Sequence, residues 1–188
     1  MALTHRRLSI PDVIAFEPKR FGDGRGYFMV TYNKEEFCEV VGQDIDFVQD
    51  NESRSAENVL RGLHYQIGSP QDKLVRVVEG EIFDVAVDLR VGSSTFGKWA
   101  GESLSGENGR QLWVPKGFAH GFFVLSRFAT VSYKVTDYWS QADERCIRWD
   151  DPDVNIDWPR DVTPLLSPKD AAGTSFSNAE YFPGDPHG

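Results

Sequence analysis

The sequence predicts an all-β fold, a sandwich or barrel of roughly ten short strands. Short runs of valine, isoleucine, phenylalanine and tyrosine recur along the chain, separated by turns rich in glycine and proline. This pattern is typical of all-β domains. The length of 188 residues suits one domain with its own core. We therefore expect a single domain over residues 1–188, and a small barrel of this kind can hold one ligand in its mouth.

The N-terminal part predicts two strands, a turn and the clearest helix. The strands are expected at 13–16 and 27–32, on either side of a glycine-rich turn at 21–26. No Gly-Lys-Ser/Thr follows that turn, so it indicates a tight loop and not a phosphate cradle. The helix is expected over 33–41, because Asn33 can cap it, Glu36 follows three residues later and Gly42 can end it.

The middle of the chain carries the strongest sheet signal. A short strand at 47–51 is expected to enter a polar loop at 52–58, and another strand follows at 61–66. Two apolar runs within 73–90 flank Glu79-Gly80, which predicts a hairpin. In the second run Asp84 and Asp88 alternate with a purely apolar face, so we expect their side to form a half-polar cavity wall.

Later segments predict strands and then a loop-rich end. The strands are expected at 97–104, 111–115, 121–125 and 130–138. From Trp149 onward aspartate and proline dominate and the sheet signal fades. We expect a loop-rich extension from about residue 161, with a short helix near 167–172.

Composition excludes several classes of protein. A hydrophobic content of 40% excludes a disordered chain. A net charge of -9 argues against general binding to nucleic acid or to an anionic membrane, although a few basic side chains in one cleft could still bind a phosphorylated ligand. No signal peptide or membrane-spanning run is visible, so a cytoplasmic location is expected. Cys38 and Cys146 form no metal-binding spacing and indicate ordinary thiols in a reducing compartment.

Two histidines stand out as candidates for chemistry. His64 and His120 each lie beside glycines in aromatic strands, and Lys73 and Tyr133 lie on neighbouring strands. One such histidine is more often a structural hydrogen-bonding group, but the set favours a site. Metal-binding barrels usually carry two histidines one residue apart, and here Gln66 occupies the second position, so no catalytic metal is expected. A metal-free set of histidine, lysine and tyrosine favours proton transfer.

Eight runs resemble, in order, the dTDP-4-dehydrorhamnose 3,5-epimerase family, which has a cupin jelly-roll fold. They are residues 22–26 (GDGRG), 49–51 (QDN), 61–64 (RGLH), 72–76 (DKLVR), 83–88 (FDVAVD), 115–122 (PKGFAHGF), 133–134 (YK) and 167–170 (SPKD). Each run is modest alone, but the ordered set covers nearly the whole chain. The resemblance implies a cupin jelly roll with short peripheral helices and no cofactor.

The resemblance also implies a reaction on dTDP-4-dehydro-6-deoxy-D-glucose, whose ketone acidifies the hydrogens on carbons 3 and 5. By similarity His64 is the base, and Asp170 orients it by bonding its far nitrogen. Lys73 stabilises the enolate, and Tyr133 returns a proton from the opposite face. The expected product is dTDP-4-dehydro-L-rhamnose, for L-rhamnose biosynthesis.

The substrate-binding residues carry over in the same way. The resemblance implies that Arg25, Arg61 and Lys169 bind the diphosphate or sugar, although a solvated surface charge is the alternative for each arginine. The other expected contacts are Gln49, Asn51, His120, Glu144, and the aromatic pair Phe21 and Tyr138, which would stack on the thymine. In this family the segment from Phe21 to Arg25 reaches a neighbouring subunit's site, which implies a homodimer.

One departure and three alternatives stay open. Val30 stands where the family commonly has a glutamate that contacts the nucleotide, so the nucleotide preference is open. A relative that epimerises only carbon 3 or only carbon 5 is the nearest alternative. A metal-dependent cupin enzyme and a non-catalytic sugar-nucleotide-binding module are more remote.

Overall fold

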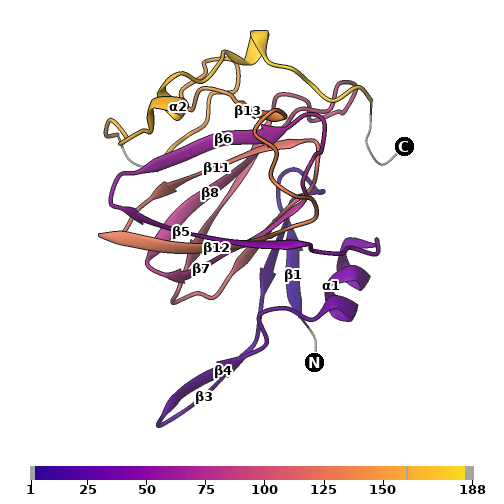
Figure 1. The fold of residues 1–188 in the computed structure, drawn as a ribbon. Coiled ribbons are helices and arrows are strands. Elements are labelled where there is room, and N and C mark those ends of the chain that lie inside the picture. Colours follow the sequence, from indigo (N-terminus) through magenta and orange to yellow (C-terminus); the bar gives the residue numbers. More distant parts are fainter. Residues whose placement is uncertain (1–2, 160, 185–188) are drawn as a thin grey trace.

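Two antiparallel sheets stacked face to face form the body of the protein in a computed structural model that describes residues 3–159 and 161–184 (Figure 1). The six-stranded sheet has the order β1 (Thr4–Arg7), β2 (Ile14–Glu17), β10 (Gln111–Val114), β7 (Lys73–Glu79), β12 (Phe128–Val135), β5 (Gln49–Ala56). The five-stranded sheet has the order β13 (Glu144–Cys146), β6 (Leu60–Gln66), β11 (Phe118–Val124), β8 (Glu81–Asp88), β9 (Trp99–Ser105). The all-β prediction is confirmed, as a two-sheet arrangement.

The main core lies between the two sheets. It joins Val75 and Val131 of the six-stranded sheet to Ile82, Ala86 and Phe122 of the five-stranded one, all nearly inaccessible to solvent. Side chains of a strand alternate between its two faces, so every second residue of these strands enters this layer.

The predicted helix is confirmed and lies beside the six-stranded sheet. It is α1 (Lys34–Val41), and the Asn33 side chain accepts hydrogen bonds from the backbone N–H groups of Glu35 and Glu36. It ends at Gly42, whose φ of 81° is in the left-handed region that glycine adopts without strain. Just before it, β3 (Arg20–Asp23) and β4 (Gly26–Met29) form a hairpin that projects away from the body (Figure 1).

Two predictions for the middle of the chain are wrong. β7 and β8 do not form a hairpin, because β7 pairs with β10 and β12 whereas β8 pairs with β9 and β11. The turn at Gly80 instead carries the chain from one sheet to the other, and a Cβ there would lie 2.1 Å from the Phe128 carbonyl oxygen. The stretch 52–58 is not simply a polar loop, because β5 continues to Ala56 with polar side chains on both faces. Because both faces are polar, this stretch lacks the alternation of apolar and polar residues that predicts a strand.

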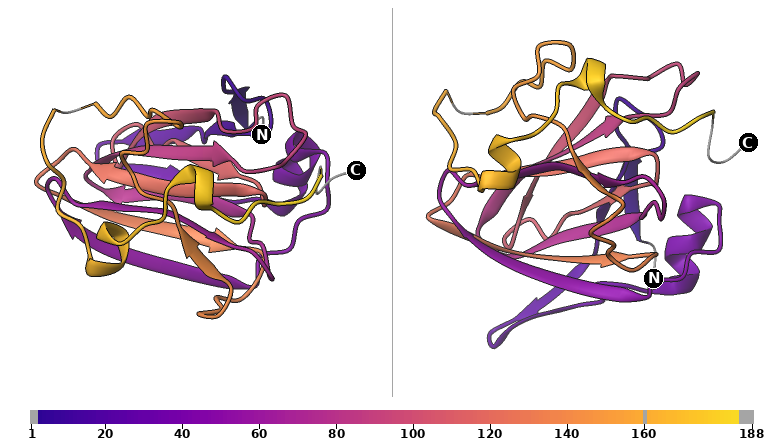
Figure 2. Two further views of the ribbon diagram at one scale, coloured as in Figure 1. Left: turned by 90° about the horizontal axis from the view of Figure 1, so that it is seen from above. Right: turned by 45° about the horizontal axis from the view of Figure 1, so that its top comes forward.

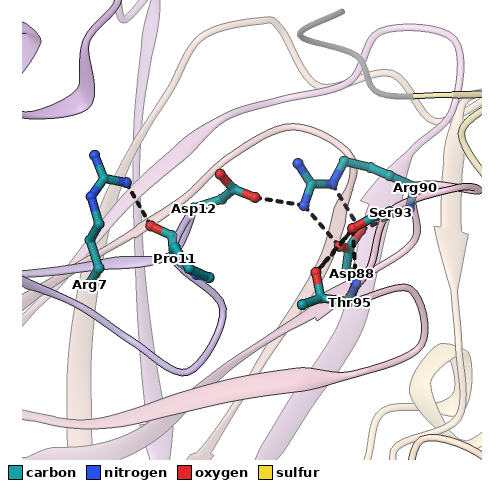
Figure 3. A network of polar contacts seen from close by, with 7 residues as sticks. All are labelled: Arg7, Pro11, Asp12, Asp88, Arg90, Ser93 and Thr95. Atoms are coloured by element: carbon teal, nitrogen blue, oxygen red, sulfur yellow. Dashed lines mark hydrogen bonds and ion pairs between the residues drawn. The ribbon is translucent and has the colours of Figure 1, made fainter.

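Asp88 does not line a cavity, contrary to expectation. Its carboxylate accepts hydrogen bonds from Arg90, Ser93 and Thr95, and Arg90 also pairs with Asp12 at 2.7 Å (Figure 3). Asp88 and Arg90 are buried, so the network satisfies two opposite charges inside the protein. It ties the turn after β1 to the end of β8.

The C-terminal segment covers the outer face of the five-stranded sheet. In Figure 2 the yellow chain crosses above those strands. Its Phe176 and Phe182 pack with Val85 and Val87 of β8, the face predicted to be core. The predicted short helix is α2 (Pro168–Ala171), and a 3-10 turn, η1 (Phe176–Asn178), follows. Strands β1, β3 and β13 were not predicted, and β3 occupies part of the stretch 21–26 that was expected to be a turn. Within residues 3–159 and 161–184, no helix has the length and apolar character needed to cross a membrane.

Candidate active site

A cavity of about 310 Å³ opens between the sheets. Strands β5, β7 and β12 supply one wall, and β6 and β11 supply the other. The lining residues are Gln49, Asn51, Ser53, Arg61, His64, Tyr65, Gln66, Gln71, Lys73, His120, Phe122, Tyr133, Trp139, Glu144 and Lys169. The inner layer therefore changes along the sheets from an apolar core to a polar pocket.

His64 is held by Asp170 at one wall. Its Nε2 lies 2.5 Å from Asp170 Oδ1, and Asp170 comes from α2 across the end of β6. Ser167 caps α2 and its hydroxyl donates to Asp170 Oδ2 at 2.7 Å, so the carboxylate is fixed from both sides. An ionised carboxylate accepts Nε2–H, which leaves the lone pair of the neutral ring on Nδ1.

The surroundings keep this imidazole neutral and the carboxylate charged. Burial lowers the pKa of His64 and outweighs the opposing effect of Asp170. Burial by itself would raise the pKa of Asp170, but the hydrogen bonds from His64 and Ser167 outweigh it, and this pKa is lowered. The pair is therefore a neutral base with an anionic partner at neutral pH.

Close packing of two strands brings His120 beside His64. The two histidines are direct cross-strand partners on β11 and β6. A Cβ on Gly62 would lie 2.6 Å from the Gly121 Cα, so glycine is required where the strands approach. His120 Nε2 lies 2.7 Å from Asp84 Oδ1, and Asp84 is fully buried behind it. Asp84 thus supports a cavity residue and does not line the cavity itself.

Lys73 and Tyr133 lie on the opposite wall. Burial lowers the pKa of Lys73 to about 8, although the charge of Asp84 opposes this change. The ammonium also donates a hydrogen bond of 3.4 Å to the His64 carbonyl oxygen. Tyr133 pairs in register with Asn51 and Val75, and burial raises its pKa while the positive charge of Arg61 opposes that rise. A base and a phenol thus line one cavity from different sheets.

Charged side chains also surround the cavity. Lys169 Nζ lies 2.8 Å from Glu144 Oε1, and Arg61 Nε donates to the Ser55 hydroxyl at 2.9 Å. Burial by itself would raise the pKa of Glu144, but the ion pair with Lys169 outweighs it and lowers this pKa. Together with Lys73, three cationic side chains therefore face a cavity in an otherwise acidic protein, which suits an anionic ligand.

The profile of the dTDP-4-dehydrorhamnose 3,5-epimerase family matches residues 7–178. The chain belongs to this family. A dTDP-4-dehydrorhamnose 3,5-epimerase from Pseudomonas aeruginosa is 60% identical over 177 residues, which are 94% of this chain and 98% of that protein. The named activity of that relative is an isomerase activity.

Solved structures of epimerases have the same fold. The dTDP-6-deoxy-D-glucose-3,5-epimerase of Legionella pneumophila, in complex with dTDP-4-keto-L-rhamnose, superposes with a TM-score of 0.94 at 48% identity. The match covers 97% of this chain and 98% of that one. A dTDP-4-dehydrorhamnose 3-epimerase from Streptomyces niveus is also similar, at 40% identity over 166 residues, which are 88% of this chain and 80% of that protein.

Most residues predicted from the epimerase resemblance meet at this cavity. Asp170 lies behind His64, and the cavity lining includes His64, Lys73, Tyr133, Gln49, Asn51, Arg61, His120, Glu144 and Lys169. Three others lie outside it. Phe21 and Arg25 belong to the projecting hairpin, where Arg25 pairs only with the neighbouring Asp23 among the contacts of the described chain, and Tyr138 is exposed.

Several lining residues were not predicted as site residues from the sequence. Ser53 continues the two-residue spacing of Gln49 and Asn51, so that spacing could have identified it. Trp139 carried no such signal, because it follows the end of β12. Gln66 is buried and its side chain bonds the backbone of Ser69, Tyr138 and Ser140, so it secures the loop that bears Tyr138 and Trp139. Cys146, expected to be an ordinary thiol, has its Sγ 3.9 Å from Asp170 Oδ1.

Proposed function

We propose that this protein epimerises carbons 3 and 5 of dTDP-4-dehydro-6-deoxy-D-glucose and forms dTDP-4-dehydro-L-rhamnose for L-rhamnose biosynthesis. The observation that carries the proposal is the pairing of a neutral, carboxylate-bound His64 on one sheet with the phenol of Tyr133 on the other, across one cavity. Inversion at carbon requires a base and an acid on opposite sides of the ring, and two facing walls satisfy that requirement.

Proton removal is assigned to His64. Nδ1 takes the hydrogen from carbon 3 or carbon 5, the C–H electron pair moves into an enolate, and the carbon 4 oxygen becomes negative. Asp170 stabilises the imidazolium that forms. The buried ammonium of Lys73 is the group assigned to the enolate oxygen, because a cation in a poorly solvated site stabilises such a charge strongly.

Proton return is assigned to Tyr133. Its hydroxyl delivers a proton to the face opposite His64, which inverts the carbon and leaves a phenolate. The positive charges of Arg61 and Lys169 favour that phenolate. His64 then loses its proton and Tyr133 regains one, so both residues are ready for the second carbon, and no metal or other cofactor takes part.

Binding is assigned to the remaining polar residues. Arg61 and Lys169 would hold the diphosphate or sugar, with Gln49, Asn51 and His120 around the sugar and Glu144 as an outer contact. The exposed hairpin carries Phe21 and Arg25, which would complete the site of a second copy in a homodimer. The thymine would stack between Phe21 and Tyr138.

The wider proposals concern the whole chain. We infer one cupin jelly-roll domain over residues 1–188, with a loop-rich extension from about 161 that belongs to it. The protein would act in the cytoplasm, with neither nucleic acid nor a membrane as a partner.

Turnover in heavy water tests the function directly. We expect NMR of the product to show deuterium at both carbon 3 and carbon 5, since each proton exchanges through His64 or Tyr133. Unlabelled sugar after long incubation would contradict the proposal. Label at carbon 3 alone would favour a 3-epimerase, the activity named for the Streptomyces niveus relative. Parallel assays with other nucleotide-linked 4-keto sugars would establish the nucleotide preference that Val30 leaves open.

A further inference from the structure

We propose that His64, Cys146 and Asp170 form a binding site for a thiophilic divalent cation such as Zn²⁺ or Cd²⁺, and that the bound cation switches the proton-transfer base off. The regulatory half of this inference rests on the proposed function. The site itself rests on the positions of three side chains.

The three side chains converge although they are far apart in the sequence. Cys146 on β13 and His64 on β6 are direct cross-strand partners, so their side chains emerge on the same face. Asp170 reaches the same point from α2. One ligand atom from each residue lies within 4.8 Å of the other two, with Cys146 Sγ at 3.9 Å from Asp170 Oδ1.

The donors suit zinc and its heavier relatives. Imidazole nitrogen, thiolate sulfur and carboxylate oxygen are the three protein ligands of zinc, and tetrahedral coordination at ordinary bond lengths separates such atoms by about 3.3 to 3.7 Å. The 2.5 Å between His64 Nε2 and Asp170 Oδ1 must therefore open by about 1 Å, whereas the 3.9 Å between Cys146 Sγ and Asp170 Oδ1 is already close to that range. Zinc sites with three protein ligands that keep an open position hold a water in the fourth place.

The surroundings already orient the ligands. Ser167 donates to the second carboxylate oxygen, Oδ2, which leaves Oδ1 directed at His64 and Cys146. Such hydrogen bonds around a metal ligand increase its affinity. The His64 side chain is 25% exposed and Cys146 is half-buried, so two of the three ligands can be reached from solvent.

Coordination would inactivate the base by changing the tautomer of the His64 ring. Without a cation, Nε2–H of His64 donates to Asp170 and the thiol carries its own proton. When a cation binds to Nε2, Sγ and Oδ1, the thiol proton is released to solvent and the imidazole proton moves from Nε2 to Nδ1. Nδ1 then has no lone pair for the hydrogen of the substrate. Inhibition is therefore complete when the site is full, and a chelator reverses it.

Cadmium titration tests the site without any assay of activity. The probe is the ultraviolet charge-transfer absorption between thiolate and Cd²⁺, recorded as one equivalent per chain is added. We expect the band in the wild type and in the matched control Cys38→Ser, and its loss in both Cys146→Ser and Cys146→Ala, with folding verified by circular dichroism. A band that survives in the two Cys146 variants, or disappears in Cys38→Ser, overturns the proposal.

Zinc inhibition tests the switch. Free Zn²⁺ is set with a metal buffer, and each variant is compared with its own activity in chelator. We expect Cys146→Ser to need at least ~10-fold more free Zn²⁺ for half inhibition than the wild type or Cys38→Ser, as for the loss of an important group at a metal site. Equal inhibition of all three proteins overturns the switch. A wild type that binds Cd²⁺ through Cys146 but lacks deuterium exchange in chelator supports the site and contradicts the proposed function.

Discussion

Burial, more than the charge of its partner, sets the state of His64. An imidazole beside an ionised carboxylate ordinarily gains a proton more easily, yet the pKa of His64 is lowered because burial has the larger effect. Lys73 responds to burial in the same direction, with a pKa of about 8. The neutral base and the protonated cation therefore coexist between the lowered pKa of His64 and the pKa of about 8 of Lys73.

Variants of the base and the acid should separate proton exchange from inversion. In Tyr133→Phe, His64 still removes a proton and returns it to the same face, so we expect deuterium exchange to persist while inverted product falls by about 10²- to 10⁴-fold. His64→Ala should lose both. NMR of the recovered sugar measures exchange and configuration in one sample.

A matched phenol supplies the control for that experiment. Tyr181 donates its hydroxyl to the Phe176 carbonyl oxygen in the outer cluster, away from the cavity. Tyr181→Phe should keep both exchange and inversion. Loss of exchange in Tyr133→Phe to the level of His64→Ala would contradict the separate roles of the two residues.

The pH profile of kcat/KM should be bell-shaped. His64 acts deprotonated and its pKa is lowered from the usual 6.5, so the midpoint of the acid limb should lie below that pH. Lys73 acts protonated, so activity should fall as pH rises through about 8. Lys73→Arg stays charged and should shift the alkaline limb to higher pH, whereas Lys134→Arg, a surface variant, should not. An unmoved limb in Lys73→Arg would assign the fall to another group.

At the scale of elements, the β3–β4 hairpin exposes an apolar surface that contacts within a single chain do not explain. It projects from the body and exposes Phe21, Tyr27 and Phe28 beside the fully solvated Arg25 (Figure 1). An isolated two-stranded hairpin is only marginally stable in water. A second copy that receives this hairpin would account for its apolar surface and for the absence of Phe21 and Arg25 from the cavity lining.

Mixing two defective variants tests that arrangement. His64→Ala and Arg25→Ala should each be impaired alone. In a two-fold dimer, a mixed pair has one site with an intact His64 from one subunit and an intact Arg25 from the other. Co-refolding equal amounts should restore about a quarter of wild-type activity, because half of the dimers are mixed and one site of two is intact. As a control, Arg25→Ala mixed with the double variant His64→Ala/Arg25→Ala should show no recovery. Equal activity in both mixtures would exclude a site to which Arg25 is contributed by the second subunit.

At the scale of the whole molecule, buried polar contacts join parts that lie far apart in the chain. The carboxylate of Asp170 connects α2 to β6, and Arg90 connects the end of β8 to Asp12 near the N-terminus. The C-terminal segment thereby both covers a sheet and supplies the carboxylate partner of His64. Such sharing of contacts supports one cooperative domain and not a domain with an independent appendage.

Asp88→Asn should destabilise the protein without altering the cavity. It removes the buried carboxylate that pairs with the buried Arg90 guanidinium, at an expected cost of about 3 kcal/mol, the lower end of the range for broken buried ion pairs. Asp12→Asn, at a half-exposed position, should cost less than about 1 kcal/mol. Urea unfolding followed by near- and far-ultraviolet circular dichroism measures both, and the two signals should coincide. Equal stability of the two variants would show that Asp88 contributes nothing beyond the surface pair.

Local signals in the sequence were sufficient for α1 and for most strands. The cap at Asn33, the glycine that ends the helix and the alternation in β8 act within a few residues, so their outcome does not depend on distant parts of the chain. Local sequence signals did not predict the segments whose conformation depends on their position in the tertiary structure. β5 has polar residues on both faces because one face lines a cavity. The turn at Gly80 joins two sheets because the strands on either side of it pair with other strands, in different sheets.

The sequence by itself determined the family, the all-β class and the set of residues suited to proton transfer. Only the tertiary structure decided which of them meet: it brought His64, Lys73 and Tyr133 to facing walls, left Phe21 and Arg25 on a projecting hairpin, and set Cys146 beside Asp170. The physical reason is that residue type and spacing specify local conformation and chemistry, whereas proximity between residues 64, 146 and 170 arises from strand pairing and from burial of the C-terminal segment.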